Sequence, residues 1–371
     1  MARRISRQSV IAMVAGFVTL GVAAGQSAAQ SKPAPKLQIS KPMQAAMDHI
    51  SPDSLRTSVQ YLASDELQGR STPSAGLDLA ADFIAAQFKK AGLEPTSGDS
   101  YFQVASLADL GTTGQRIERG LPPDAPKTMR NVAGLLRGSD PKLCDTYIIV
   151  SAHYDHMGLA TSGSDRIFNG ANDDASGTAS VIELATSLAS LKPHPKRSIL
   201  FITFFGEERG LLGSRFYGAH PIVPIAQTIA QVNLEQVGRS DGADGIHQHV
   251  ANFTGFDFSD IPAIFVSSAA AAGVQIVKDP AASDAFFGRS DNQALADLGI
   301  PAHTLSVLYD FADYHKVSDE WNKLDYPNMA AIDKAVALGL LRLASEEAPP
   351  HWNTAYPAAA RYAEAAKKLK Q

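Results

Sequence analysis

The sequence predicts an α/β protein, in which a mixed, largely parallel central sheet is flanked by helices in three layers. Apolar runs of strand length alternate along the middle of the chain with segments of helical periodicity. Such alternation is typical of a largely parallel sheet. The 371 residues are enough for one large core. We find no internal repeat and no composition shift beyond residue 43, so we expect a single domain.

The strands are expected in five apolar segments, of which 147–152 is rich in β-branched residues. The segments are 131–137, 147–152, 198–205, 228–234 and 300–307. Helices are predicted where apolar residues recur on one face. Residues 77–91 have such a face, and Gly92 then suits the C-cap. The other predicted helices are 176–191, 258–272, 293–298 and 328–344, and the aperiodic stretch 105–128 is expected to be a loop.

The amino-terminal segment is typical of a secretory signal peptide. Arg3, Arg4 and Arg7 precede an uncharged apolar run, and small residues follow at 27–29. We therefore expect a signal peptide over 1–29, a flexible leader over 30–42 and a folded domain over 43–371. The product would be exported to the periplasm or medium, without stable membrane association after cleavage. An uncleaved anchor or a twin-arginine signal is the alternative interpretation.

Charge and cysteine content narrow the class of protein. The net charge is −5 and the pI about 6.1, with no basic stripe, which argues against a nucleic-acid partner. Cys144 is the only cysteine, so no internal disulfide is expected. A metal site would have to use histidine and carboxylate ligands. No Gly-x-Ser-x-Gly sequence is present, which disfavours a serine hydrolase.

Polar clusters follow four of the predicted strands, where ligands gather in α/β sheets. The clusters begin at His153, Glu207, Glu235 and Tyr314, and a fifth, around Asp173, precedes a predicted helix. We expect all five to meet at one edge of the sheet. Any one of them alone has an ordinary explanation, such as a solvated strand end, a helix cap or a charged loop tip.

The first cluster has the form His-x-Asp, in which Asp155 can reach the far ring nitrogen of His153. Metal-binding imidazoles usually have such a partner. His156 is a rival ligand, but the alternation of the strand would turn it away from the face of His153.

The other clusters combine carboxylates with small residues. Helix capping would explain one of Asp173 and Asp174, but not the glycines and alanines on both sides. Glu207 and Glu208 can enter one site only where the strand has ended, and Gly206 allows that break. One glutamate would then bind metal and the other would carry a proton.

These residues resemble the M28 family of zinc peptidases, which includes secreted bacterial aminopeptidases with two zinc ions. The resemblance covers about residues 55–345. Its motifs are H-x-D, N-D-D-x-S-G, G-E-E-x-G-L-x-G-S, N-x-D and Y-H, found here at 153–155, 172–177, 206–214, 233–235 and 314–315. The segment 62–70 also resembles the start of the family's domain. The family's Ser-Asp-His appears here as Ser-Asp-Asn at 290–292.

The resemblance implies a zinc exopeptidase fold and two zinc ions per chain. One ion would lie on His153 and Glu235 and the other on Glu208 and His315, with Asp173 bridging them. The family has Asp at the position of Glu235, and the glutamate side chain is one methylene longer than that of Asp. The loop after residue 103 is too short for the inserted protease-associated domain that many relatives carry.

The resemblance also implies the reaction, which is hydrolysis of the amino-terminal peptide bond by a hydroxide that bridges the zinc ions. Glu207 would be the proton carrier and Tyr314 the oxyanion donor, while Asp155 would orient His153. Peptides would be the substrates. Carboxypeptidases and glutaminyl cyclases resemble the same family. For carboxypeptidase action, the cation needed for a terminal carboxylate could be Arg209, Arg215, Arg239 or Arg289. A binding protein without catalysis is a further alternative, although all five ligand positions are filled.

Overall fold

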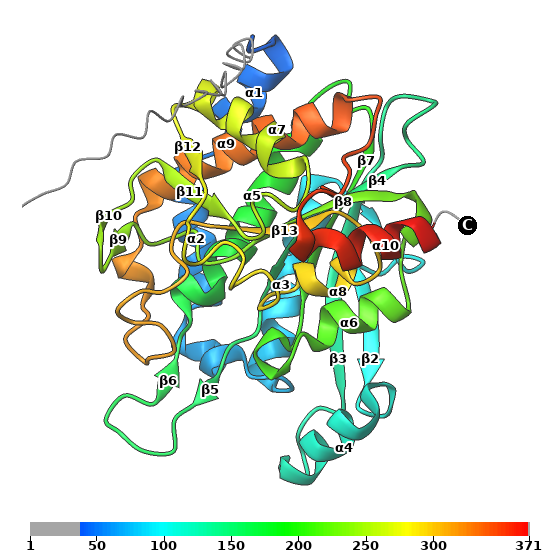
Figure 1. The fold of residues 1–371 in the computed structure, drawn as a ribbon. Helices are drawn as coiled ribbons and strands as arrows, with labels where there is room; N and C mark the ends of the chain where they lie inside the picture. Colours follow the sequence, from blue (N-terminus) through cyan, green and yellow to red (C-terminus); the bar gives the residue numbers. More distant parts are fainter. Residues whose placement is uncertain (1–37, 370–371) are drawn as a thin grey trace, which may run out of the picture. The chain divides into compact units, whose positions relative to one another are not determined.

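The structure is a computed structural model that describes residues 38–369, and these belong to one compact unit. Its main element is a nine-stranded mixed sheet in the order β1-β3-β7-β4-β8-β13-β11-β12, with β2 paired to β3 (Figure 1). The strands are β1 (Glu94–Pro95), β2 (Phe102–Ser106), β3 (Thr128–Leu136), β4 (Tyr147–His153), β7 (Ser198–Phe204), β8 (Thr228–Leu234), β11 (Val250–Phe253), β12 (Gln275–Val277) and β13 (Ala302–Ser306). Two short pairs stand apart: β5 (Gly158–Leu159) with β6 (Ile167–Phe168), and β9 (Asp241–Gly242) with β10 (Gly245–Ile246).

The centre of the sheet is parallel. Strand β4 pairs in parallel with β7 on one side and β8 on the other, and β8 pairs in parallel with β13. Antiparallel β3 and β11 extend this centre at its two sides. The carboxyl ends of β4, β7, β8 and β13 therefore share one edge. The predicted mixed α/β fold is confirmed.

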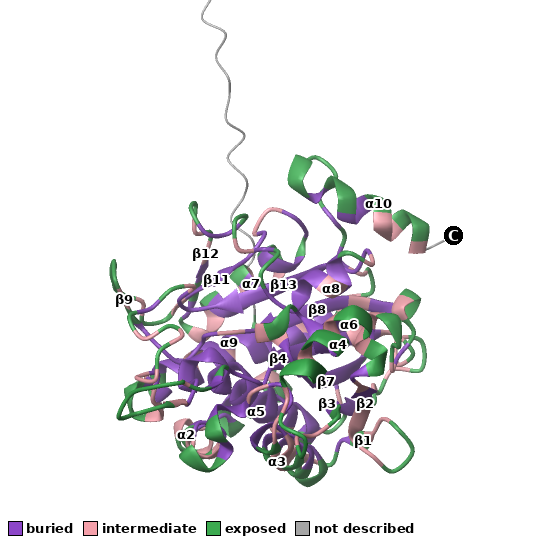
Figure 2. Ribbon diagram, turned by 90° about the horizontal axis from the view of Figure 1, so that it is seen from below, coloured by how far each residue is buried: buried purple, intermediate pink, exposed green. Residues whose placement is uncertain are grey.

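Helices cover both faces of the sheet, which makes three layers (Figures 1 and 2). Helices α3 and α5 contact the sheet on one face, and α9 packs against α5; α6 and α8 contact the other face. The helices are α1 (Lys41–His49), α2 (Pro52–Leu62), α3 (Ala75–Ala91), α4 (Gly111–Gly120), α5 (Gly177–Ser190), α6 (Leu212–Ala219), α7 (Ile261–Ala269), α8 (Asn292–Ala296), α9 (Tyr326–Ser345) and α10 (Ala360–Leu369).

Alternate residues of each central strand serve two separate cores. In β4, Ile148 and Val150 join the core beneath α3, α5 and α9, whereas Tyr147 and Ile149 join the core beneath α6 and α8. Successive side chains of a strand point to opposite faces. The run is continuously apolar because both faces are covered, and this is why it marks a central strand.

One expected loop is partly wrong. Residues 105–128 contain α4, and only Gly114 of that helix is buried. A helix that rests on the surface with so little buried area needs no apolar face, and Ile117 is the only large apolar residue of α4, so no recurring apolar residues indicate this helix. The predicted helix over 77–91 is confirmed as α3, and Gly92 ends it in the left-handed conformation with φ +80°.

The predicted signal peptide lies outside the described residues. The first described helix, α1, begins at Lys41 and is capped by Ser40, whose hydroxyl accepts the N–H of Met43. Across residues 38–369, no helix combines the length and the apolar character that a membrane span requires.

Candidate metal centre

His153 is the last residue of β4 and is fully buried. Its Nδ1 lies 3.2 Å from the backbone oxygen of Asp155 and 3.6 Å from the Asp155 Oδ1 atom. Its Nε2 faces the other way and lies 3.2 Å from Asp173 Oδ1. Asp155 therefore does lie beside the far ring nitrogen of His153. The closer of its two contacts is made by the backbone rather than by the carboxylate.

The two aspartates before α5 have different surroundings. Asp174 Oδ1 accepts the N–H of Gly177 at 2.9 Å and that of Gln236 at 3.1 Å, so capping accounts for this residue. Asp173 is turned into the site, and its backbone N–H donates to Asp319 at 3.1 Å. Asp319 also accepts the N–H of Asn172 at 3.0 Å and is itself fully buried. The Asp319 carboxylate therefore fixes the backbone that presents Asp173.

Glu207 and Glu208 follow β7 in a single turn of 3₁₀ helix. Gly206 has φ +69°, and a Cβ there would lie 2.9 Å from Leu212 Cβ. Glycine is therefore needed where the chain leaves the strand, as the sequence predicted. The Glu207 N–H donates to Asp155 Oδ1 at 3.0 Å, which ties this turn to the end of β4.

Glu235 follows β8 directly, and its N–H donates to Leu305 O in β13 at 3.1 Å. Ligand atoms of His153, Asp173 and Glu235 all lie within 4.8 Å of one another. The longer glutamate side chain therefore brings a carboxylate oxygen close to the ligand atoms of His153 and Asp173. One candidate set of metal ligands is complete at this point.

His315 completes a second set of ligands. Its Nε2 lies 3.2 Å from Asp173 Oδ2 and 3.2 Å from Glu208 Oε2. The ring stacks on Tyr314, with centroids 3.9 Å apart. Asp173 thus turns Oδ1 toward His153 and Oδ2 toward His315, which is the arrangement of a carboxylate between two metal positions.

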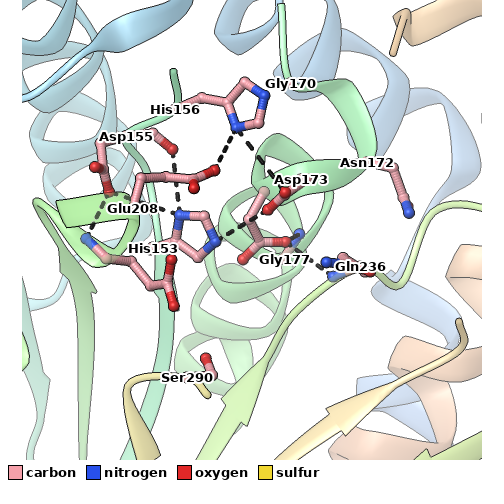
Figure 3. A network of polar contacts seen from close by, with 12 residues as sticks. His153, Asp155, His156, Gly170, Asn172, Asp173, Gly177, Glu208, Gln236 and Ser290 are labelled. Carbon is pink, nitrogen blue, oxygen red and sulfur yellow. Dashed lines mark hydrogen bonds and ion pairs between the residues drawn. The ribbon is translucent and has the colours of Figure 1, made fainter. Parts of the chain in front are cut away.

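His156 also lies in this site, so the expectation that it would point away was wrong. Its Nδ1 lies 2.8 Å from Glu208 Oε1 and 4.0 Å from Asp173 Oδ2 (Figure 3). The chain leaves the strand after His153, and the alternation of strand side chains no longer applies.

The donor atoms fit divalent metal ions. Among the described residues, four ligand atoms are buried without a hydrogen-bond partner, and they belong to different segments. They are His153 Nε2, Glu208 Oε1, Glu235 Oε2 and His315 Nε2. Both ring nitrogens of His156 are buried without such a partner as well, and ligand atoms of His156, Asp173 and Glu208 all lie within 4.8 Å of one another. Buried polar atoms are normally hydrogen-bonded, so several orphans around one point indicate an absent partner. Imidazole and carboxylate together suit zinc, and also several other divalent ions.

The electrostatics of the site also indicate a bound cation. The pKa of Glu235 is raised to about 7, chiefly by burial and also by the nearby charge of Asp173, against the opposing effect of His153. Burial also raises the pKa of Glu207 well above its usual value, with Glu235 and Asp291 contributing. Carboxylates that repel one another in a desolvated site are stabilised by a cation among them.

Arg70 is a supporting residue to which the sequence analysis gave no role. It is 1% exposed, and its guanidinium donates to the carbonyl oxygens of Tyr154 at 2.8 Å, Asn169 at 2.7 Å and Gly170 at 3.0 Å. It also donates to Leu62 O. The carbonyls of Tyr154, Asn169 and Gly170 belong to the loops that carry His156 and Asp173, so one buried cation holds both loops. Its place in the segment 62–70, which resembles the family, was the available signal.

A cavity of about 220 Å³ adjoins the first ligand set. Asp173, Glu207, Glu235 and Tyr314 line it on the metal side. Its far side combines stacked aromatic rings, one arginine and hydroxyl groups, from Phe286, Tyr309, Arg289, Ser290, Thr254, Thr304 and Ser306. The site therefore opens into a pocket that is small beside the usual range for ligand sites, about 300–1,000 Å³.

The fold and the donor atoms together define a class of protein. Its members are α/β proteins with a histidine and carboxylate site at the carboxyl ends of parallel strands. The chain belongs to peptidase family M28, whose family model matches residues 131–339. The matched segment contains all five predicted ligands. The resemblance seen in the sequence is confirmed.

Known proteins agree with this assignment. A "Probable zinc metalloprotease" of Pyrenophora teres f. teres (strain 0-1) is 30% identical over 207 residues, which are 55% of this chain and 42% of that protein. The chain thus spans less than half the length of this curated relative. The structure of the Legionella pneumophila LapA aminopeptidase has a TM-score of 0.63 at 22% identity, and covers 85% of this chain and 78% of its own. Porphyromonas gingivalis glutaminyl cyclase has a TM-score of 0.56 at 19% identity, with 78% and 98% covered. These two structures share the fold.

Proposed function

We propose that this protein is an exported aminopeptidase that holds two zinc ions per chain and hydrolyses the amino-terminal bond of peptides. The observation that carries the proposal is the position of Asp173, whose two oxygens each lie 3.2 Å from a different histidine. One ion would be held by His153, Asp173 and Glu235. The other would be held by Glu208, His315 and the second oxygen of Asp173.

When bound, paired zinc ions polarise the scissile carbonyl and lower the pKa of an attacking water toward neutrality. Glu207 lines the cavity together with Asp173 and Glu235, and it belongs to neither candidate metal group. Its carboxylate accepts the proton that the water loses, and then donates it to the nitrogen that leaves as the carbon–nitrogen bond breaks. The Tyr314 hydroxyl, at the edge of the same cavity, donates to the oxygen of the carbonyl under attack.

The small cavity supports an exopeptidase rather than an endopeptidase, because it has room for about one residue on the far side of the reacting bond. Glu207, Glu235 and Asp310 line this space with carboxyl groups. A free amino terminus is a cation at neutral pH and suits that lining. A blocked terminus would lose this attraction.

Carboxypeptidase action is the second candidate, because Arg289 lines the same cavity. Its guanidinium stacks over Phe286 at 4.2 Å and makes no ion pair with a described carboxylate within 4.0 Å. Arg239, in contrast, is paired with Asp241 and Asp313. Arg209 and Arg215 line a separate hollow.

A substrate panel on the metal-loaded protein separates these functions. The panel compares aminoacyl amides with a free amine, the same amides acetylated, amino-blocked peptides with a free carboxyl terminus, and peptides that begin with glutamine. We expect cleavage of the free amides alone and two zinc ions per chain by elemental analysis. Release of carboxyl-terminal residues from the blocked peptides would favour a carboxypeptidase. Cyclisation of amino-terminal glutamine, with one zinc ion, would favour a cyclase.

A further inference from the structure

The loop that joins β13 to α9, residues 307–325, carries both Tyr314 and His315. The side chain of His315 is 33% exposed, against 4% for Asp173 and 11% for Glu208. Its φ of +53° lies in the left-handed region, which residues with a side chain rarely adopt. Such a backbone persists only where the surrounding structure over-determines it. The contacts that hold this loop therefore decide where the His315 ring lies.

Asp313 is the centre of the contacts within the loop. Its Oδ1 accepts the Ser318 hydroxyl at 2.6 Å, and its Oδ2 accepts Arg239 Nη1 at 2.8 Å and Lys323 Nζ at 3.0 Å. Asp313 precedes His315 in the chain, whereas Ser318 and Lys323 follow it. The carboxylate therefore ties together the two sides of the loop around His315.

Arg239 links the same carboxylate to the other loops of the site. Its side chain is 5% exposed and also donates to both oxygens of Asp241, at 2.6 Å each. Its backbone N–H donates to Asn172 Oδ1 at 3.0 Å, and Asn172 directly precedes Asp173. Arg239 itself lies on the segment that follows Glu235. One residue thus connects the segments that carry three of the candidate ligands.

The pair of Arg239 and Asp313 differs from an ordinary surface ion pair. Its two side chains are 5% and 15% exposed, whereas those of Lys127 and Glu118 are 51% and 54% exposed. Exposed pairs contribute little to stability because water and salt screen them. Charge-assisted hydrogen bonds between less exposed groups are stronger, and the loss of one partner leaves the other charge poorly solvated.

We propose that Asp313 and Arg239 are positioning residues, whose ion pair holds His315 in place for the second metal ion, the one beside Glu208. The inference rests on the proposed two-metal site. A histidine that is already in place loses little freedom when the metal binds. Residues that orient a metal ligand without binding the metal typically change metal affinity about 10–100-fold. The first ion should not depend on the pair, because His315 is not among its ligands.

The test compares Asp313→Ala, Arg239→Gln and the variant that carries both changes. The backbone bond from residue 239 to Asn172 remains in each of them. Asp82→Asn is the matched control, because Asp82 on α3 makes an ion pair with Arg130 at 2.7 Å and is 58% exposed. Zinc content is measured after dialysis at a series of free zinc concentrations, and kcat is measured as zinc is added back. Thermal unfolding in chelator shows whether each variant is folded.

We expect Asp313→Ala to keep one zinc ion at a free zinc concentration where the wild type and the control keep two. This corresponds to an affinity for the second ion that is about 10–100-fold lower. Arg239→Gln should lose a similar amount, and the double variant no more than either single variant, because the two residues act as a pair. The kcat of each variant should rise toward the wild-type value as zinc is added.

Unchanged affinity for the second ion in Asp313→Ala would overturn the inference. Equal weakening of both ions would overturn it too, because that result indicates a general structural role. If Asp313→Ala does not fold, the zinc content of Arg239→Gln decides by the same criteria. A wild type that takes up fewer than two ions would instead refute the proposed function, and this inference with it.

Discussion

Replacing Glu207 with glutamine tests the proposed proton carrier with little structural change. The substitution exchanges one carboxylate oxygen for an amide nitrogen and keeps the length of the side chain. The Glu207 backbone still donates to Asp155 Oδ1 at 3.0 Å, so the turn after β7 stays anchored. Neither ligand set includes Glu207, and both metal positions should remain intact.

The expected loss can be estimated from the role of this one side chain. General acid–base catalysis typically contributes about 10²–10⁴-fold, which corresponds to about 2.7–5.4 kcal/mol of barrier. The Glu207→Gln substitution should lower the activity without lowering the free energy of unfolding. Burial and the neighbouring Glu235 and Asp291 raise the pKa of Glu207, so the carboxylate charge is unfavourable in the metal-free fold. Glu207→Gln should therefore unfold at the wild-type temperature or above it.

The assay measures kcat on a free aminoacyl amide, together with zinc content and thermal unfolding. Glu118→Gln is the matched control, because Glu118 lies on α4 and makes an exposed ion pair with Lys127. We expect the control to behave as the wild type. A Glu207→Gln enzyme that binds zinc and keeps more than a tenth of the wild-type kcat would refute the assignment of Glu207.

Three further substitutions test the neighbourhood of the site and the core. Tyr314→Phe keeps the stacking on His315 and removes only the hydroxyl. We expect kcat to fall about 10²-fold with unchanged zinc content, because the oxyanion donor is lost. An unchanged kcat would show that Tyr314 only packs against His315. Asp319→Asn weakens the acceptor that holds the Asp173 backbone, and zinc affinity measured by chelator competition should fall about 10–100-fold. Asp333 on α9 is fully buried near Ser180 and Glu183, and burial raises its pKa well above 3.8. The native state therefore holds this proton more tightly than the unfolded chain, and stability falls as the pH rises above 3.8. In urea unfolding, Asp333→Asn should lose less stability than the wild type between pH 5 and pH 8, and equal losses would contradict this reasoning.

The sequence was informative where strand patterns place chemistry at a known edge. His153, Glu207 and Glu235 directly follow the central strands or their terminal glycine, and the parallel centre of the sheet brings them together. Runs that are apolar on both faces mark those strands without any knowledge of their partners. The candidate ligands could therefore be named before their distances were known.

The supporting residues could not be found in this way, because their roles depend on contacts between distant segments. Asp319 acts on a backbone 146 residues earlier in the chain, and Arg70 on carbonyls up to 100 residues later. His156 was misjudged because a strand rule was carried past the end of the strand. Helix α4 has almost no buried face, so periodicity could not indicate it. Each of these predictions failed because the answer depends on which tertiary contacts a residue makes.

The most direct test of the central claim is anomalous diffraction from crystals of the zinc-loaded protein. We expect two zinc peaks on either side of Asp173, one beside His153 and Glu235 and the other beside Glu208 and His315. A single peak, or two peaks that do not share Asp173, would contradict the proposed two-metal site.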